Sequence, residues 1–314
     1  MSKFLITIIL ILPLQALGQN DTISFVAYWS KGDVFKYQVK KTTKIWRDGK
    51  LSQRKEGNYK ARLEVLDSTA TYYRVQWTYE INPKKFFNLP DNVQNLALKL
   101  SKMKVIYKTS ELGEFQELEN WQEVYQTLLG MSEVILQSYK DKLSDTEKKA
   151  MKERLNAFLK LYNSSEGIAS LFLKELQVLH FAFGAAFKVG DTVTYEDQLP
   201  NMMGGKPLKA DAKLFIDKVD TVTQQCVLRH QMHINPAAAK AFMLQVIQKM
   251  GASKETVQQE IGQAKFDIND DNYLEYNYVF GVPIKIRTHR VAHIQFKDSK
   301  NRREDKVNIQ LIRD

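Results

Sequence analysis

The sequence has a single cysteine, Cys226, and none of the common enzyme motifs. One thiol cannot form a disulfide within the chain, so packing alone must stabilise the fold. Cys226 lies in a run of alternating apolar residues, which favours a buried, inert thiol over a nucleophile. The chain also has no glycine-rich phosphate loop, no Gly-x-Ser-x-Gly, no His-Glu-x-x-His and no Cys-x-x-Cys. No catalytic residue and no cofactor is therefore predicted, and a non-enzymatic protein is the favoured interpretation.

Long apolar runs are missing too, except near the start of the chain. Residues 4–14 read FLITIILILPL, and Ala16 and Gly18 follow at the spacing that signal peptidase recognises. The run is too short for a membrane span, so residues 1–18 are predicted to be a secretory signal peptide. No cysteine follows it, which argues against a lipid anchor. We expect an exported protein, periplasmic or extracellular, with no transmembrane segment after cleavage near Gly18.

Acidic residues are in the minority: 46 Lys and Arg stand against 36 Asp and Glu, a net charge of +10. The basic pairs are scattered along the chain (Lys40-Lys41, Lys84-Lys85, Lys148-Lys149 and Arg302-Arg303) without interleaved aromatics. Nucleic acid is therefore not an expected partner. A solvated surface explains the charge most simply, and contact with anionic envelope surfaces is the alternative.

Several short features occur twice in the same order. Ile-Asn-Pro stands at 81–83 and again at 234–236, and Gly-Asp opens a strand-like stretch at 32–33 and again at 190–191. The shared order predicts a tandem duplication of one β-rich unit.

Alternating apolar residues identify the strands. The clearest run is 72–81, which has the pattern of an antiparallel strand with one buried face. In the corresponding run, 226–234, His230 stands where the first unit has Trp77. Asp48-Gly49 is a hairpin signal between two further strands. The predicted fold is α+β, with two related antiparallel β-sheet units and helices packed on the sheets.

Helical spacing of apolar residues predicts an insert between the two units. Helices are expected over 118–143 and 168–187, and a capping box at 144–147 opens another. Each Ile-Asn-Pro is expected to begin a helix, over 86–100 and 237–250, because Asn caps helices and proline is tolerated at the first position. The predicted organisation is a signal peptide (1–18), a first β-rich unit (19–117), a helical insert (118–187) and a second β-rich unit (188–314).

Histidines are the most site-like residues. His230 and His233 are three apart, which places them on opposite faces of a strand, whereas His289 and His293 are four apart and share a face. The candidate metal ligands are therefore His233, His289 and His293. Ordinary surface histidines are the favoured interpretation, and no metal is predicted.

A polar run at 267–272 resembles the opening of a calcium loop. Asn272 and Tyr278 stand where an EF-hand requires Gly and Glu, so the motif fails. A polar hairpin turn is predicted at 267–272 instead.

The organisation as a whole resembles the half-barrel carriers of the bacterial envelope, and also the uncharacterised β-rich exported proteins of Gram-negative bacteria. The carriers hold lipid or lipoprotein acyl chains between a curved sheet and helices. The resemblance therefore implies a cavity for an apolar or amphipathic ligand, and it carries over no functional residue.

Candidates for lining such a pocket are aromatic residues of the expected inner faces and one histidine: Phe35, Tyr37, Trp77, Tyr79 and His230. An ordinary packed core would use the same aromatic residues. The leading hypothesis is a non-enzymatic binder of a lipid or another apolar ligand. The alternatives are a structural component that contacts an envelope protein and, less favoured, a hydrolase with two titratable residues in a cleft.

Overall fold

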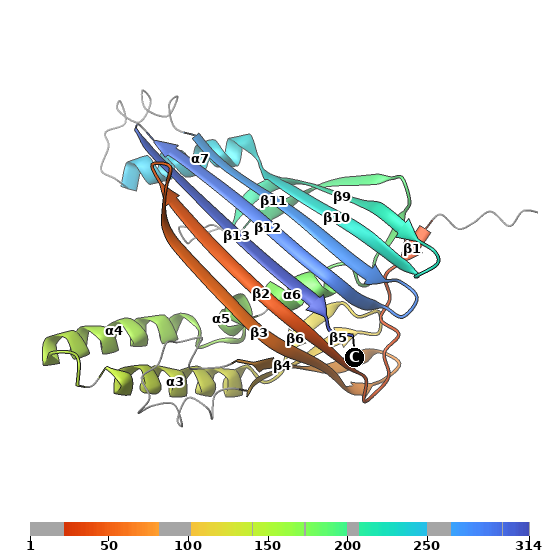
Figure 1. Ribbon diagram of the computed structural model, residues 1–314, viewed down its shortest axis with the longest axis horizontal. Helices are drawn as coiled ribbons and strands as arrows, with labels where there is room; N and C mark the ends of the chain where they lie inside the picture. The colour runs from red at the N-terminus through yellow and green to blue at the C-terminus, as the bar shows by residue number, and fades with distance from the viewer. Residues whose placement is uncertain are drawn as a thin grey trace, which may run out of the picture.

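A computed structural model describes residues 22–81, 102–139, 141–172, 174–199, 207–249, 265–296 and 298–313 (Figure 1). Most of them form one antiparallel sheet of eleven strands. In sheet order the strands are β6 (Phe115–Leu118), β5 (Lys102–Ser110), β4 (Tyr72–Glu80), β3 (Lys50–Ser68), β2 (Val34–Arg47), β13 (Ser299–Leu311), β12 (Val282–Phe296), β11 (Lys265–Asn277), β10 (Gln225–Ile234), β9 (Leu208–Asp220) and β8 (Thr192–Leu199). Two short strands, β1 (Thr22–Ser24) and β7 (Ala186–Lys188), pair separately.

The strands of the two predicted units thus occupy the two halves of a single sheet. The halves meet where β2 pairs with β13, and every neighbouring pair is antiparallel. The α+β class is confirmed. The signal peptide predicted at 1–18 and the helix predicted at 86–100 lie outside the described residues.

Five helices are described. They are α3 (Trp121–Ser138), α4 (Asp145–Leu161), α5 (Ser165–Phe172), α6 (Lys174–His180) and α7 (Pro236–Lys249). Ser144 and Glu147 form the predicted capping box of α4, and α7 follows the second Ile-Asn-Pro as expected, with the Asn235 side chain accepting the Ala237 N–H at 3.0 Å.

The single helix predicted over 168–187 is wrong. Helix α6 ends at His180, residues 181–184 form a turn, and Phe187 belongs to β7. Gly184 has φ = +82°, a conformation that glycine adopts without strain. Its N–H donates to the Phe25 carbonyl at 2.9 Å, so pairing with the distant 22–25 segment overrides the helical pattern.

The polar turn predicted at 267–272 is wrong as well. Strand β11 continues through it, because its polar side chains find partners on both faces of the sheet. On the outer face Asn269 contacts His233 and Asp271 contacts Arg229. On the other face Asp270 and Asn272 are buried.

Helix α6 shows that the sheet is curved. The hydroxyl of Tyr107 on β5 lies 2.8 Å from His180 Nε2, and that of Tyr276 on β11 donates to the Leu179 carbonyl at 3.1 Å. Strands β5 and β11 are six positions apart in the sheet, about 29 Å if the sheet were flat. Adjacent residues of one short helix reach both strands, so the sheet bends around α6. We call this concave face the inner face.

Two hydrophobic cores lie on the inner face. The larger one, under α6 and the 25–29 segment, contains the fully buried side chains of Trp77, Tyr37 and Tyr107. The smaller one lies under α7, where the rings of Phe242 and Phe266 stack with centroids 4.3 Å apart. The two cores contact different stretches of the same strands, which leaves a zone between them.

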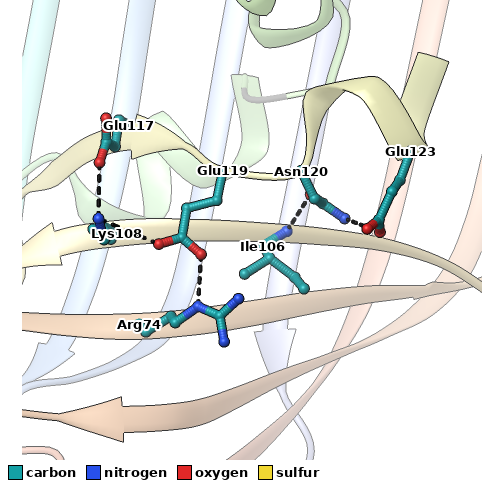
Figure 2. Close-up of polar contacts among 7 residues, drawn as sticks. All are labelled: Arg74, Ile106, Lys108, Glu117, Glu119, Asn120 and Glu123. Atoms are coloured by element: carbon teal, nitrogen blue, oxygen red, sulfur yellow. Dashed lines mark hydrogen bonds and ion pairs between the residues drawn. The ribbon is translucent and has the colours of Figure 1, made fainter.

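A polar junction fixes the start of α3 against the sheet (Figure 2). The side-chain oxygen Oδ1 of Asn120 accepts the Ile106 N–H of β5 at 2.8 Å, and its side-chain amide Nδ2 donates to the Lys104 carbonyl at 3.2 Å. Beside it, Glu119 accepts from Arg74 at 2.6 Å and lies 3.4 Å from Lys108. Two strands, β4 and β5, are therefore joined to the segment that begins α3.

Candidate ligand-binding cavity

A row of polar side chains crosses the inner face between the two cores. Strand register aligns four of them, on β2, β13, β12 and β11 in turn: Thr43, Asp305, Arg290 and Asp270. Two more, His230 of β10 and Asn272 of β11, are register partners of each other. Asn272 is the next inward-facing residue after Asp270 on β11. We call these six residues the polar row. Inward positions of a sheet covered by helices are normally apolar, and departures from that pattern are expected at functional sites.

The charged members of the polar row are paired. Arg290 donates to both oxygens of Asp270, from Nε at 2.6 Å and from Nη2 at 2.5 Å. Asp305 accepts from Thr43 Oγ1 at 2.6 Å and from Arg303 Nε at 2.7 Å. Asp270 is only 7% exposed, and a carboxylate so far from water is costly unless it is paired and hydrogen-bonded.

His230 is stacked between two aromatic rings. The ring of Phe181 lies 4.5 Å from it and nearly parallel, and the ring of Tyr195 lies 6.2 Å away. Asn272 donates to Nδ1 at 3.4 Å, so the proton of the neutral ring is on Nε2, which lies 3.0 Å from the Tyr195 hydroxyl and 3.8 Å from Asp197.

Burial lowers the pKa of His230, against the smaller opposing effect of the Asp197 and Asp270 carboxylates. Burial also raises the pKa of Tyr195 to about 12, and the charge of Asp197 raises it further. At neutral pH both groups are therefore uncharged and can exchange hydrogen bonds with a ligand.

The polar row forms the floor of a cavity of about 700 Å³ between the inner face and α6. Small-molecule sites have volumes in the range of roughly 300–1,000 Å³. Its polar lining includes the polar row, Asp197, Gln198 and the Lys41–Glu175 ion pair. Its apolar lining residues are Val178, Phe181, Met232, Leu274, Val307 and Ile309. Strand register places Met232 opposite Asp270 and Val307 in line with Asn272, whereas Leu274 and Ile309 lie one inner position beyond them. The lining is thus polar along the line from Thr43 to Asp270, mixed next to it, and apolar at Leu274 and Ile309.

Most charges in the cavity lining are paired with one another. Lys41 pairs with Glu175, Arg290 with Asp270 and Arg303 with Asp305; of the remaining two charged residues, Lys306 pairs with Glu304 outside the lining, and Asp197 lies 3.8 Å from neutral His230. A ligand with net charge would leave a buried charge uncompensated, so the lining favours a neutral or zwitterionic polar group.

Of the five predicted pocket residues, only His230 lines this cavity. Tyr37, Trp77 and Tyr79 are packed in the larger core, where the rings of Tyr37 and Trp77 stack 5.7 Å apart. Phe35 lines a separate hollow of about 560 Å³ at the other end of the strands, with Tyr28 and Phe280.

The three histidines considered as candidate metal ligands, for which ordinary surface residues are the favoured interpretation, lie on the outer face. His233 contacts Asn269 at 2.5 Å, and His289 lies 2.9 Å from Glu304. His293 is exposed and stands opposite Asp267 in register. Within the described ranges, no group of three His, Cys, Asp or Glu side chains is placed to hold a metal ion.

Cys226 is buried in the larger core. Burial raises the pKa of its thiol to about 12, with a further contribution from the Glu275 charge. The thiol is therefore protonated at neutral pH, as the prediction of an inert cysteine requires.

Sequence reasoning missed the central members of the polar row. Asp270 and Asn272 were assigned to a turn, and Arg290 was not singled out. The alternation of the strand could have found them. Leu274 and Tyr276 face inward, and every second residue before them, Asn272, Asp270 and Ile268, must face the same way.

Comparison with known proteins adds little. No family model matches the chain, and no curated protein matches its sequence. Among solved structures, it is similar to a "putative lipoprotein" from Parabacteroides distasonis ATCC 8503 at 9% identity, over 90% of this chain and 96% of that one, with a TM-score of 0.20. Ail, the attachment invasion locus protein of Yersinia pestis, matches at 4% identity over 90% and 99% of the chains, with a TM-score of 0.17. Scores this low support no argument about function.

No helix in the described part of the chain combines the length and apolarity needed to cross a membrane.

Proposed function

We propose that the protein binds an amphipathic ligand in the cavity between α6 and the inner face. The observation that carries this proposal is the mixed lining: the hydrogen-bonded charges of the polar row lie close in register to the aliphatic side chains of Leu274 and Ile309, and Phe181 lines the same cavity. The polar end of the ligand is neutral or zwitterionic, and its apolar end lies against Val178, Leu274 and Ile309. The protein acts as a carrier or sensor and performs no chemistry on the ligand.

The test uses lysophosphatidylcholine, a single-chain zwitterionic amphiphile, as the probe. Native mass spectrometry of the purified protein should show one bound molecule, and calorimetric titration should show saturable binding. Dodecyl sulfate, an anionic amphiphile with a similar tail, should bind at least tenfold more weakly, because its charge has no free partner in the cavity.

Val178→Trp supplies the matched loss-of-function variant. The half-buried Val178 on α6 lines the cavity, so an indole there fills it and abolishes binding. The control is Glu153→Trp on the exposed surface of α4, which leaves binding unchanged. Thermal melts establish that both variants are folded. Equal binding by wild type and a folded V178W variant would contradict the proposal, as would binding of dodecyl sulfate with equal affinity.

A hydrolase is the second candidate, and one observation favours it. Three titratable groups meet at the cavity wall: His230 Nε2 lies 3.0 Å from the Tyr195 hydroxyl and 3.8 Å from the Asp197 carboxylate. Turnover of short-chain nitrophenyl esters that is lost in His230→Ala and kept in His293→Ala would support this function. If the wild-type protein shows no turnover, the hydrolase is excluded and ligand binding remains as the proposed function.

We also propose that the chain is exported and arose by tandem duplication, in the style of the envelope carriers that its organisation resembles. Strands β2–β5 and β8–β11 follow one another in the same order, six positions apart in the sheet, and Ile-Asn-Pro follows both β4 and β10. A role in contact with an envelope protein is compatible with the same fold, since Val193 on the edge strand β8 is 45% exposed.

A further inference from the structure

Basic residues that are scattered along the sequence gather at one end of the sheet. Because β13 pairs with β2, the β2–β3 and β12–β13 hairpins end side by side, near α7 in Figure 1. The Lys300 N–H donates to the Asp48 carboxylate at 2.8 Å, and the Asp48 N–H donates to the Lys300 carbonyl at 2.7 Å. The two hairpin tips are therefore joined. We call residues 44–55 and 298–303 the tip surface.

Positive charge dominates the tip surface. It holds two aspartates, Asp48 and Asp298, and eight cations: Lys44, Arg47, Lys50, Arg54, Lys55, Lys300, Arg302 and Arg303. Asp48 is engaged by the backbone of Lys300. Arg54, Arg302 and Arg303 pair with the nearby Glu56, Glu304 and Asp305. Four other cations, Arg47, Lys50, Lys55 and Lys300, are exposed and have no ion pair within the described ranges. Much of the positive charge at this end is thus uncompensated.

Apolar side chains accompany the cations. Leu51 is the second residue after the hairpin turn and is 51% exposed. Its register partner Trp46 is half-buried, and the guanidinium of Arg302 lies 4.6 Å from the Trp46 ring. An exposed aliphatic residue at the apex of a basic projection is suited to a surface that is anionic outside and apolar beneath.

We propose that the tip surface docks on an anionic lipid bilayer. The cations are attracted by the negative surface potential, and Leu51 enters the headgroup region. Single-stranded nucleic acid fits less well, because the Trp46 ring is occupied by Arg302 and is not free to stack on bases. The proposal does not depend on the occupant of the cavity. Thr43 and Asp305 of the polar row lie on the same two strands, so docking would bring the cavity close to the bilayer.

Vesicle flotation tests the proposal directly. The protein should float with vesicles of phosphatidylcholine mixed with phosphatidylglycerol, and not with vesicles of phosphatidylcholine alone. Binding should weaken steeply as salt is raised, because exposed charges separated by more than about 10 Å are screened at 0.1 M ionic strength.

Two triple variants distinguish an effect of the tip-surface charge from an effect of the net charge of the protein. Arg47→Gln, Lys50→Gln and Lys55→Gln remove three exposed cations from the tip surface. Lys149→Gln, Lys152→Gln and Lys160→Gln remove three exposed cations from α4. The first variant should bind anionic vesicles at least tenfold more weakly than wild type, given the attraction of each cation near such a surface. The second should bind within about twofold of wild type.

Three results would overturn the assignment. One is no flotation of the wild-type protein with anionic vesicles, and another is an equal loss in both triple variants, which would indicate a net-charge effect. The third is a single-stranded oligonucleotide that displaces the protein from vesicles and loses affinity only in the tip variant, which would reassign the surface to nucleic acid. None of these measurements requires lysophosphatidylcholine, so failure here is distinct from failure of the binding function.

Discussion

His180 lies inside the concave face, and its two ring nitrogens have different partners. Nδ1 lies 2.7 Å from the Gly113 carbonyl and must carry the proton, so Nε2 accepts from the Tyr107 hydroxyl at 2.8 Å. Burial lowers the pKa of His180 to about 4, although the Gly113 hydrogen bond opposes this. The residue is therefore a neutral hydrogen-bonding link between α6, β5 and the loop after β5.

The pH dependence of stability should report this burial. In the unfolded chain the histidine takes up a proton near pH 6.5, whereas in the folded chain it does so only near pH 4. Its contribution to stability is complete above about pH 6.5 and is lost as the pH falls towards 4. The free energy of unfolding from this group should decrease by roughly 3 kcal/mol over that interval, as measured by urea denaturation.

His180→Gln should flatten that dependence, since glutamine does not titrate there. The exposed His293→Gln on β12 is the matched control and should leave the slope unchanged. If the wild type and H180Q lose stability in parallel between pH 6.5 and 4, the buried neutral state of His180 is wrong.

At the scale of elements, the insert is held to the sheet by a polar contact at the start of α3 (Figure 2). Asn120 is 8% exposed and stands at the N-cap of α3, yet its side chain makes no capping bond to the helix. It bonds the backbone of β5 instead, at Ile106 and Lys104. The residue therefore orients a helix relative to a strand.

Asn120→Ala should lower the free energy of unfolding by about 1–3 kcal/mol, because it leaves the Ile106 N–H and the Lys104 carbonyl without their partner. Thr127→Ala, further along α3, removes an exposed hydrogen bond to the Glu123 carbonyl and should cost less than about 0.5 kcal/mol. Guanidinium denaturation measures both. Equal losses would mean that the Asn120 contact contributes no more than a surface bond.

Local patterns predicted the elements well where one face is apolar. The alternation of β4 and the capping box of α4 are local signals, and both elements formed as expected. The turn after His180 was missed because its cause is Phe25, which is far away in sequence. The polar row was missed for the same reason, since the partner of Asp270 is Arg290 on the next strand. From the sequence alone Asp270 has no identifiable partner, and an unpaired carboxylate indicates an exposed turn.

The whole molecule depends on one seam, the pairing of β2 with β13. Eleven register pairs, from Asn301–Arg47 to Leu311–Tyr37, connect the two halves of the sheet. Ile309 lies in the apolar part of the seam, near its Leu311 end; it is 1% exposed and stands between Val39 on β2 and Ile286 on β12. Contacts so distant in sequence are slow to form, so folding is expected to be slow.

Ile309→Ala should destabilise the protein by about 2–5 kcal/mol, through lost burial and the resulting cavity. Gln310→Ala is the matched control, on the same strand but on the opposite face and half-exposed, and should cost about 1 kcal/mol or less. Equilibrium denaturation of both variants decides the matter. A single cooperative transition is expected for I309A, and separate melting of two halves would show that the seam does not unite them.

The seam also sets an order of events during synthesis. Strand β2 is made early, but its partner along one edge, residues 301–311, leaves the ribosome only after all the other strands. Throughout translation the edges of β2 and β12 remain open to other chains, and open edges are sites of intermolecular pairing. A released chain truncated shortly before residue 301 would lack β13 and leave the edges of β2 and β12 exposed together. Such a chain should be a substrate for chaperones that bind extended segments, and the full chain should not.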